Sequence, residues 1–353
     1  MIVEENKVLA PYTTLGIGGP ARWFISPQSE EDIAEATTWA RAKGALLFVL
    51  GGGSNLLVAD AGFDGLVLHI DLNGIQVQEE ADGSKERLYQ VAAGEDWDQF
   101  VQRTVEDDCG GLECLAGIPG TVGGTPVQNV GAYGQEVSSV IDRVRAFDLR
   151  ACTFVEFSPA ECGFAYRHSR FNSTDRGRFV VTRVDYRLKL HGSPTLKYAD
   201  LQKAFATEVM PGLRDAAAVV RRIRRSKGML IVEGDPDCRS AGSFFKNPIA
   251  NAEQVAAVAA VAGVDPPQFP AGPGNERSVK LAAAWLIEKT GFTKGYALGR
   301  AGISSKHTLA LVNRGGATAA EIMALAEKIR DEVARRFGIH LQMEPVILGF
   351  ENS

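Results

Sequence analysis

Three consecutive glycines, Gly51 to Gly53, are followed by Ser54 and Asn55 between two apolar runs of the sequence. Glycines and small hydroxyl residues leave backbone N–H groups uncovered, and such groups form concave binding sites for anions. The spacing is not the G-x-G-x-x-G of dinucleotide-binding turns, because Leu56 stands where the third glycine would be. We expect a strand after Asn55, which disfavours a site on a helix N-terminus. The loop alone fits a sharp turn as well as a phosphate cradle.

Two further glycine-rich stretches lie at Gly16–Gly19 and Gly117–Gly134. Each fits a turn or an anion site in the same way. The run VVRRIRRSKG, Val219 to Gly228, could supply countercharge to an anionic ligand, although a solvated helix face explains most of its arginines equally well. Anion binding in a cleft is therefore the chemistry that these residue types suggest.

Other classes of chemistry find little support in the sequence. The five cysteines form no C-x-x-C pair and the five histidines are scattered, so we expect reduced thiols and no metal site. The formal net charge of −5 argues against nucleic acid as a partner. No basic-then-apolar leader and no run of bilayer-spanning length is visible, which predicts a cytoplasmic protein with no membrane partner.

The elements that must position these loops change in character along the chain. Residues 1–70 predict strand, helix, strand and strand, with Ser29 as the helix N-cap and Gly44 as its stop. Residues 71–204 alternate β-like runs with one helix in DWDQFVQRTVEDD, which predicts an antiparallel or mixed sheet.

Helices dominate the pattern from residue 205 onward. They are predicted in LRDAAAVVRRIRRSKG, AEQVAAVAAVAG, SVKLAAAWLIEKTG and TAAEIMALAEKIRDEVARRFG, the last beginning at Ala317–Thr318 and ending at Gly338. The Pro/Gly-rich stretch 264–278, VDPPQFPAGPGNERS, is predicted as a loop, either an internal excursion or a mobile cover.

Eight sequence blocks together carry a resemblance to a known family. In chain order they are PYTTLGIGG, LGGGSNLLV, AGIPGTVGGTPVQNVGAYG, FAYRHSRF, AGSFFKNP, SVKLAAAWLIEKTGFTKG, SSKHTLALVN and MEPVILGF. This pattern covers essentially the full length and resembles the UDP-N-acetylenolpyruvoylglucosamine reductases, also called UDP-N-acetylmuramate dehydrogenases, which complete UDP-N-acetylmuramate for bacterial peptidoglycan. The block LKYADL, centred on Tyr198, resembles the subgroup in which a loop tyrosine closes over the substrate.

The resemblance implies an α+β fold with FAD bound in the manner of the vanillyl-alcohol-oxidase (PCMH) type. Two FAD-binding subdomains would span 1–70 and 71–204, and a C-terminal α+β substrate-binding domain 205–353, whose last strand, carrying Glu344, could return to the flavin. None of the histidines lies in the glycine loops, so FAD is expected to be non-covalent. The pyrophosphate would lie on Gly51–Asn55. The rest of the cofactor would be wrapped by Pro119, Gly120, Thr121, Gly123, Gly124, Thr125, Gln128, Asn129, Gly131 and Ala132.

Reduction of an enolpyruvyl ether needs a hydride on C3, a proton on C2 and stabilisation of the charge that develops in the adjoining carboxylate. By residue type alone, Arg167 reads as a surface arginine, Glu344 as a solvated charge and Ser243 as a turn hydroxyl. The resemblance implies instead that Ser243 protonates C2 while Arg167 and Glu344 polarise the carboxylate. We expect Lys246 or an ordered water to assist Ser243.

The resemblance also implies a set of substrate contacts and a second substrate, NADPH. The contacts would be Tyr133, Tyr166, Tyr198, Lys227, Asn247, Lys280, Lys294 and His307, with Arg224 as a weaker candidate. One cationic channel that serves two pyrophosphate-containing ligands implies a ping-pong scheme. The protein is expected to be a monomer. No residue pattern indicates a preference for NADPH over NADH. The alternatives are an FAD-dependent alcohol or sugar oxidase of the same fold and a nucleotide-binding regulatory protein without turnover.

Overall fold

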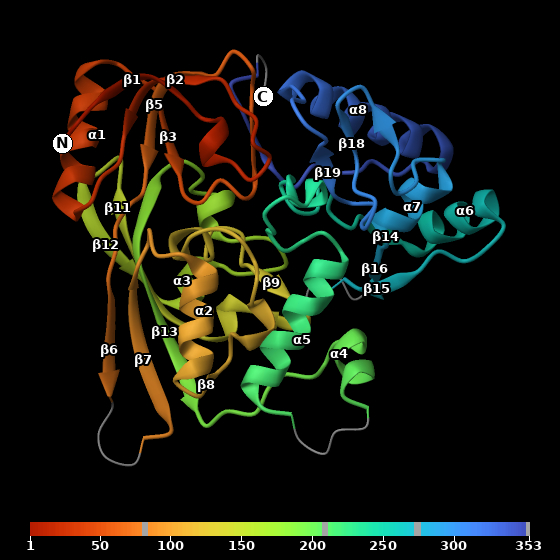
Figure 1. The fold of residues 1–353 in the computed structure, drawn as a ribbon, viewed down its shortest axis with the longest axis horizontal. Coiled ribbons are helices and arrows are strands. Elements are labelled where there is room, and N and C mark those ends of the chain that lie inside the picture. The colour runs from red at the N-terminus through yellow and green to blue at the C-terminus, as the bar shows by residue number, and fades with distance from the viewer. Residues whose placement is uncertain (80–83, 207–210, 272–276, 351–353) are drawn as a thin grey trace. The chain divides into compact units, whose positions relative to one another are not determined.

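The computed structural model describes residues 1–79, 84–206, 211–271 and 277–350. The chain divides into two compact units (Figure 1). The first comprises Met1–Lys7, Ala21–Gly52 and Asp64–Ser226, and the second comprises Val8–Pro20, Gly53–Phe63 and Lys227–Ser353. The three-part division predicted at residues 70 and 204 stays a prediction.

A four-stranded sheet opens the chain. Its order is β1 (Glu4–Val8), β2 (Pro20–Ile25), β5 (Phe63–His69) and β3 (Leu47–Leu50), with β3 parallel to β5. Helix α1 (Glu30–Ala42) begins after Ser29, whose hydroxyl accepts the N–H of Asp32 at 3.1 Å. Ile33, Ala36 and Ala40 bury one face of α1 in the core. The helix predicted from its N-cap is confirmed.

A six-stranded antiparallel sheet forms the body of the first unit. Its order is β12 (Thr153–Phe157), β11 (Ile141–Asp148), β13 (Phe179–Leu190), β7 (Glu86–Ala92) and β6 (Ile75–Glu79), and β8 (Cys109–Gly110) also pairs with β13. Helix α2 (Trp97–Glu106) packs Trp97 and Phe100 against Tyr186 of β13 with ring centroids 5.9 and 5.2 Å away. The predicted antiparallel sheet and the helix in DWDQFVQRTVEDD are confirmed. The expectation of one helix in residues 71–204 was wrong, because the short helices α3 (Pro159–Cys162) and α4 (Ala199–Ala204) also form there.

Further helices, a strand pair and 3-10 turns belong to the first unit. They are α3 (Pro159–Cys162), α4 (Ala199–Ala204), α5 (Leu213–Ser226), the antiparallel pair β9 (Gly131–Ala132) and β10 (Gln135–Glu136), and the 3-10 turns η2 (Glu113–Leu115), η3 (Val122–Gly124), η4 (Val137–Ser139) and η5 (Arg170–Asn172). Figure 1 shows α2 next to the long strands β7 and β13, and α5 on the far side of α2 from these strands. The glycine-rich stretch that begins at Gly117 therefore belongs to a layer of turns that packs with these helices.

Among its described residues, the second unit holds three small sheets and three helices. The sheets are β14 (Ile249–Asn251), β16 (Ser278–Leu281) and β15 (Gln268–Pro270); β17 (Ala297–Leu298), β18 (Ala301–Ile303) and β19 (Leu311–Asn313); and the parallel pair β4 (Leu56–Val58) and β20 (Val346–Leu348). The helices are α6 (Ala252–Ala262), α7 (Ala283–Lys289) and α8 (Ala319–Phe337), with 3-10 turns η1 (Ala10–Tyr12) and η6 (Pro236–Cys238). Pairing with β4 places the last strand beside the segment that follows the glycine triplet.

Helix α8 has the ends that its sequence predicts. Thr318 and Glu321 form a reciprocal capping box at its start, and Gly338 adopts a left-handed conformation at its end. The strand expected after Asn55 is β4, and it is buried throughout. Both predictions are confirmed.

Two further predictions of local structure were wrong. Residues 278–281, placed in a helix, form strand β16 because this segment pairs on both sides, with β14 and β15. The helix starts only at Ala283, whose N–H donates to the side-chain oxygen of Asn247 at 3.0 Å. Within the predicted loop, Gln268–Pro270 forms β15, where a proline is tolerated because the strand lies at the edge of its sheet. Residues 272–276 of that loop lie outside the described residues.

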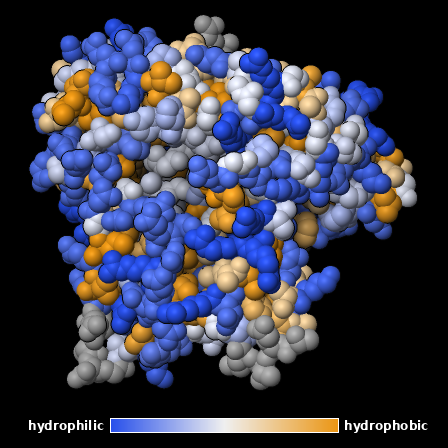
Figure 2. Space-filling model, in the orientation of Figure 1, coloured by the Kyte–Doolittle hydropathy of each residue, from blue (hydrophilic) through white to orange (hydrophobic). Residues whose placement is uncertain are grey.

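Hydrophilic side chains cover most of the face drawn in Figure 2, with hydrophobic side chains in smaller groups between them. Of the helices that the structure describes, none has both the length and the apolar character needed to cross a bilayer.

Candidate functional site

The first glycine loop touches the second within the first unit. A Cβ on Gly52 would lie 2.6 Å from the Cα of Gly120, and one on Gly51 would lie 2.8 Å from the Oγ1 of Thr121. Distances this short leave no room for any side chain on Gly52, because its neighbour is backbone. The two loops therefore meet backbone to backbone.

Both the backbone conformation of Gly53, in the second unit, and the space around it exclude a side chain. Its φ of +59° is left-handed, and a Cβ there would lie 1.9 Å from the carbonyl oxygen of Tyr12. The Gly53 carbonyl accepts the N–H of Thr14 at 3.2 Å, which holds the two segments together. Only glycine fits this position.

In the part of the chain that the structure describes, the N–H groups of Gly51, Gly52, Gly53 and Ser54 donate to no acceptor. By contrast, the N–H of Gly123 donates to Ala93 at 2.8 Å, so the second loop uses part of its donors for its own fold. A row of uncommitted N–H groups fits an anionic group such as the pyrophosphate of FAD.

Two other predicted cofactor residues, Thr125 and Asn129, form side-chain hydrogen bonds within the protein. The Thr125 hydroxyl lies 2.7 Å from the Tyr186 hydroxyl, beneath the loop. Asn129 is buried, and its side-chain amide donates to Glu136 at 3.0 Å and to the Ala165 carbonyl at 3.1 Å. These two residues are thus placed to shape the second glycine loop.

Arg167 and three tyrosines of the predicted site lie in the first unit. Arg167 donates to the Gly131 carbonyl at 3.0 Å, and its guanidinium carbon lies 5.7 Å from the Tyr166 ring centre. The rings of Tyr133 and Tyr198 meet edge to face with centroids 5.3 Å apart. Arg167 and Tyr133 have φ values of +54° and +49°, conformations that cost energy in residues other than glycine and that cluster at functional sites.

Arg224 of α5 lies against the start of the second glycine loop. Its Nε donates to the Gly117 carbonyl at 3.0 Å. Burial lowers the pKa of Arg224, an effect opposed by Tyr133 and Asp98. The carboxylate of Asp98 accepts the Gly117 N–H at 2.6 Å and binds Arg221 at 2.5 Å. Arg221 and Arg224 therefore hold the fold together as well as contributing positive charge. Asp98 is a partner that no pattern in the sequence indicated.

Ser243 and Glu344 come together in the second unit. The residue after Ser243, Phe244, accepts the backbone N–H of Glu344 at 2.9 Å, and the N–H of Lys246 donates to the Gln342 carbonyl at 2.9 Å. The side-chain amide of Asn55 also donates to the Glu344 carbonyl, at 3.3 Å. Glu344 lies two residues before β20 and not on the last strand, as had been expected. The segment that leads into this strand aligns the serine segment, Glu344 and the end of the first glycine loop.

His307 lies near two of the predicted substrate-contacting lysines of the second unit. Burial, and then the positive charges of Lys227 and Lys294, lower the pKa of His307 to about 4. Asp237 fixes the turn before it by accepting the N–H and the hydroxyl of Ser305 at 2.8 and 2.6 Å. Lys227, Lys294 and His307 therefore share one electrostatic environment, and Asp237 is a supporting residue that the sequence did not reveal. Lys280 lies on β16, opposite Ile249 and Phe269.

The depressed pKa of His307 makes a prediction about stability. The folded state disfavours the imidazolium, so this contribution to stability is present above pH 6.5 and is lost as pH falls toward 4. Between pH 7 and pH 5 the wild type should lose at most about 2 kcal/mol through this group, less to the extent that solvent reaches the ring. Urea unfolding of wild type and His307→Gln at both pH values checks this. An equal pH dependence in the two proteins would contradict it.

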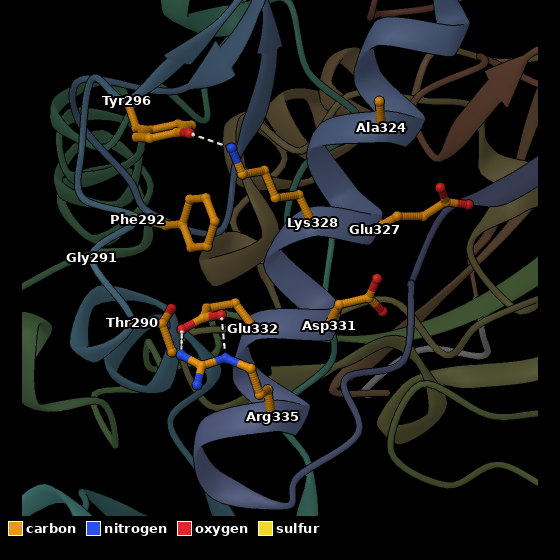
Figure 3. Close-up of a pocket in the computed structure, with 10 residues that line it drawn as sticks. All are labelled: Thr290, Gly291, Phe292, Tyr296, Ala324, Glu327, Lys328, Asp331, Glu332 and Arg335. Carbon is orange, nitrogen blue, oxygen red and sulfur yellow. Dashed lines mark hydrogen bonds and ion pairs between the residues drawn. The ribbon is translucent and has the colours of Figure 1, made fainter.

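The structure also has an open groove of about 660 Å³ along α8. Figure 3 shows the Lys328 amine donating to the Tyr296 hydroxyl at 3.3 Å and the Glu332–Arg335 ion pair on its wall. None of the predicted catalytic, cofactor or substrate residues lines it. We therefore do not assign the chemistry to this groove.

The predicted residues divide between the two units. The first holds Gly51, Gly52, the second glycine loop, Tyr133, Tyr166, Arg167, Tyr198 and Arg224, and the second holds Gly53, Ser54, Asn55, Lys227, Ser243, Lys246, Asn247, Lys280, Lys294, His307 and Glu344. Within each unit the contacts above bring members of the set together. The roles given to these residues stay predictions.

Comparison with known proteins identifies both parts of the chain. A family model described as "FAD binding domain" matches residues 21–156, and one described as "UDP-N-acetylenolpyruvoylglucosamine reductase, C-terminal domain" matches residues 235–348. The chain thus carries an FAD-binding domain, which confirms FAD as the expected cofactor.

Relatives match over nearly the whole length. The UDP-N-acetylenolpyruvoylglucosamine reductase of Thermobifida fusca is 48% identical, with 98% of each chain covered, and that of Streptomyces coelicolor is 47% identical, with 98% of this chain and 90% of the relative covered. A crystal structure of UDP-N-acetylenolpyruvylglucosamine reductase from Thermus caldophilus matches with a TM-score of 0.67 at 28% identity, covering 99% of this chain and 100% of that one. The expected fold class is confirmed. The chain therefore belongs to the UDP-N-acetylenolpyruvoylglucosamine reductase family.

Proposed function

We propose that the protein reduces UDP-N-acetylglucosamine enolpyruvate to UDP-N-acetylmuramate in peptidoglycan precursor synthesis, with non-covalent FAD and with NADPH as the electron donor. The observation that carries this proposal is the 48% identity to a reductase of that name over 98% of both chains. The match to the reductase's own C-terminal domain favours it over the alcohol or sugar oxidase, which would share only the flavin-binding part. We further propose a monomer that acts on small molecules in the cytoplasm.

FAD, when bound, supplies the hydride that reaches C3 of the substrate. The uncommitted N–H groups of Gly51–Ser54 support the placement of its pyrophosphate on this loop. Pro119, Gly120, Thr121, Gly123, Gly124, Thr125, Gln128, Asn129, Gly131 and Ala132 would hold the rest of the cofactor. The backbone contact between Gly52 and Gly120 supports a single cradle made from both loops.

The protein's own part in the chemistry is to handle charge and one proton. Addition of hydride at C3 leaves negative charge on C2 and in the carboxylate next to it. Arg167, a planar bidentate donor, and Glu344 would polarise that carboxylate, while the Ser243 hydroxyl gives its proton to C2. The backbone hydrogen bond from Glu344 to the carbonyl of Phe244 supports a joint role for Ser243 and Glu344.

The remaining residues would hold the UDP sugar and orient it. Lys227 and Lys294, beside a neutral His307, present two positive charges to a pyrophosphate, and the lowered pKa of His307 keeps it from adding a third. Tyr133, Tyr166 and Tyr198 would cover the sugar, and Asn247 and Lys280 would contact it as well. If NADPH uses the same cationic contacts, the two ligands take turns and the kinetics are ping-pong.

The visible spectrum of the purified protein tests this function. We expect flavin absorbance that is bleached by anaerobic NADPH and restored by UDP-N-acetylglucosamine enolpyruvate. Bleaching by an alcohol or sugar in place of NADPH would favour the oxidase. A colourless protein that takes up no FAD would favour the regulatory alternative, and a ternary complex with both ligands would contradict the ping-pong scheme.

A further inference from the structure

Glu113 is a fully buried carboxylate in the first unit, and the proposed reaction makes no use of it. Three N–H groups donate to it. The backbone of Gly111 donates to one oxygen at 2.8 Å, while the Gln135 side chain and the Thr195 backbone donate to the other at 2.6 and 2.8 Å. A buried carboxyl group is costly unless it is hydrogen-bonded, and here both of its oxygens accept.

The backbone N–H, the hydroxyl and the carbonyl of Thr195 all form hydrogen bonds with Glu113 or with residues around it. Its N–H binds Glu113, its hydroxyl accepts from Gln135 at 3.1 Å, and its carbonyl accepts from the Cys114 thiol at 3.1 Å. Burial, with a smaller effect of the Glu113 charge, raises the pKa of Cys114 to about 12, so the thiol keeps the proton that it donates. Thr195 is therefore a fixed point in a segment, residues 192–197, that has no helix or strand.

The fixed point lies three residues before Tyr198, no more than about 10 Å of extended chain. The segment lies along the hairpin that carries Gln135, because a Cβ on Gly134 would be 3.3 Å from the Cβ of Lys197. Tyr198 is 42% exposed, and its ring meets Tyr133 of the same hairpin edge to face. The place of Tyr198 thus depends on an anchor that is itself buried.

We propose that Glu113 is a positioning residue for Tyr198: with Gln135, it anchors the segment at Thr195 and so holds the tyrosine where it covers the substrate. This inference rests on the proposed function, in which Tyr198 closes over the enolpyruvyl sugar. Glutamine cannot replace Glu113 without loss, because its amide group would turn N–H donors toward a backbone N–H. The anchor therefore needs two acceptor oxygens, which a glutamine side chain of the same shape does not provide.

The test compares Glu113→Gln in the FAD-bound enzyme with and without Tyr198→Ala. With Tyr198 present, KM for UDP-N-acetylglucosamine enolpyruvate should rise about tenfold, the worth of one hydrogen bond to a charged group, while kcat falls less. In the Tyr198→Ala background the same change should alter KM by less than about twofold, because residues that act through one another are not additive. Amide exchange over residues 192–198, measured without substrate, should become about tenfold faster in Glu113→Gln.

Two further variants keep the test decisive. Thr195→Val keeps the backbone bond to Glu113 but removes the hydroxyl acceptor, so it should fold and raise KM about threefold in the same direction. Asp148→Asn removes another buried carboxylate of the first unit, one that binds Arg178 at 2.7 Å, and should lower the melting temperature while leaving KM unchanged.

An equal rise of KM in both backgrounds, or unchanged exchange over residues 192–198, would overturn the inference. So would a lowered melting temperature with unchanged KM, since that is the result of a purely structural carboxylate. A wild type that does not turn over the enolpyruvyl sugar would instead overturn the proposed function, and the exchange measurement separates that failure from the failure of the anchor.

Discussion

Ser243→Ala should leave reduction of the bound flavin by NADPH near its wild-type rate and slow its reoxidation by the enolpyruvyl substrate by about 10²–10⁴-fold. This is the usual worth of a positioned general acid, about 3–5 kcal/mol in activation free energy. Only the second half-reaction needs a proton at C2, so only that half should respond. Anaerobic stopped-flow absorbance measures the two halves separately.

A nearby serine provides the control for this experiment. Ser240 lies three residues earlier in the same segment, is buried, and its hydroxyl accepts the N–H of Gly242 at 3.3 Å. Ser240→Ala therefore perturbs the segment without removing the proposed acid, and both half-reactions should stay within a few-fold of wild type. An equal loss in both halves for Ser243→Ala would mean that this serine shapes the site and does not donate the proton.

The elements that were predicted correctly from the sequence have local causes. Ser29 bonds to an amide three residues away, and Thr318 and Glu321 cap each other within one turn, so a short stretch of sequence contains the whole signal. The segments that were predicted wrongly have distant partners. Residues 278–281 are apolar enough for a helix, but they form a strand because they pair with residues 249–251 and 268–270.

The same distinction holds at the candidate site. The glycine triplet is visible in the sequence, but the reason for it is not, because Gly52 is constrained by Gly120 and Gly53 by Tyr12, each about 40 or more residues away. Asp98, Asp237 and Glu113 carry no motif, since their partners come from separate segments. Ser243 and Glu344 are aligned by pairing across about 100 residues, so sequence could name them only through the family resemblance.

Gly53→Ala should lose FAD and much of its stability, whereas Gly44→Ala should lose little of either. Both glycines have left-handed φ values, +59° and +61°, so both substitutions cost about 1–2 kcal/mol in backbone strain. They differ in space: nothing lies within 4 Å of a Cβ on Gly44, whereas a Cβ on Gly53 would lie 1.9 Å from the Tyr12 carbonyl oxygen. Relief of that overlap must move the backbone on which the amides of Gly53 and Ser54 are mounted.

The two variants therefore separate conformational strain from displacement of the loop. Thermal unfolding should show a clearly lower melting temperature for Gly53→Ala than for Gly44→Ala, and the ratio of flavin to protein absorbance should fall only in Gly53→Ala. If the two variants retained flavin equally, the loop would not need its present backbone path to bind the cofactor. The cradle would then have to be sought in the second glycine loop, many of whose own donors are already committed to the fold.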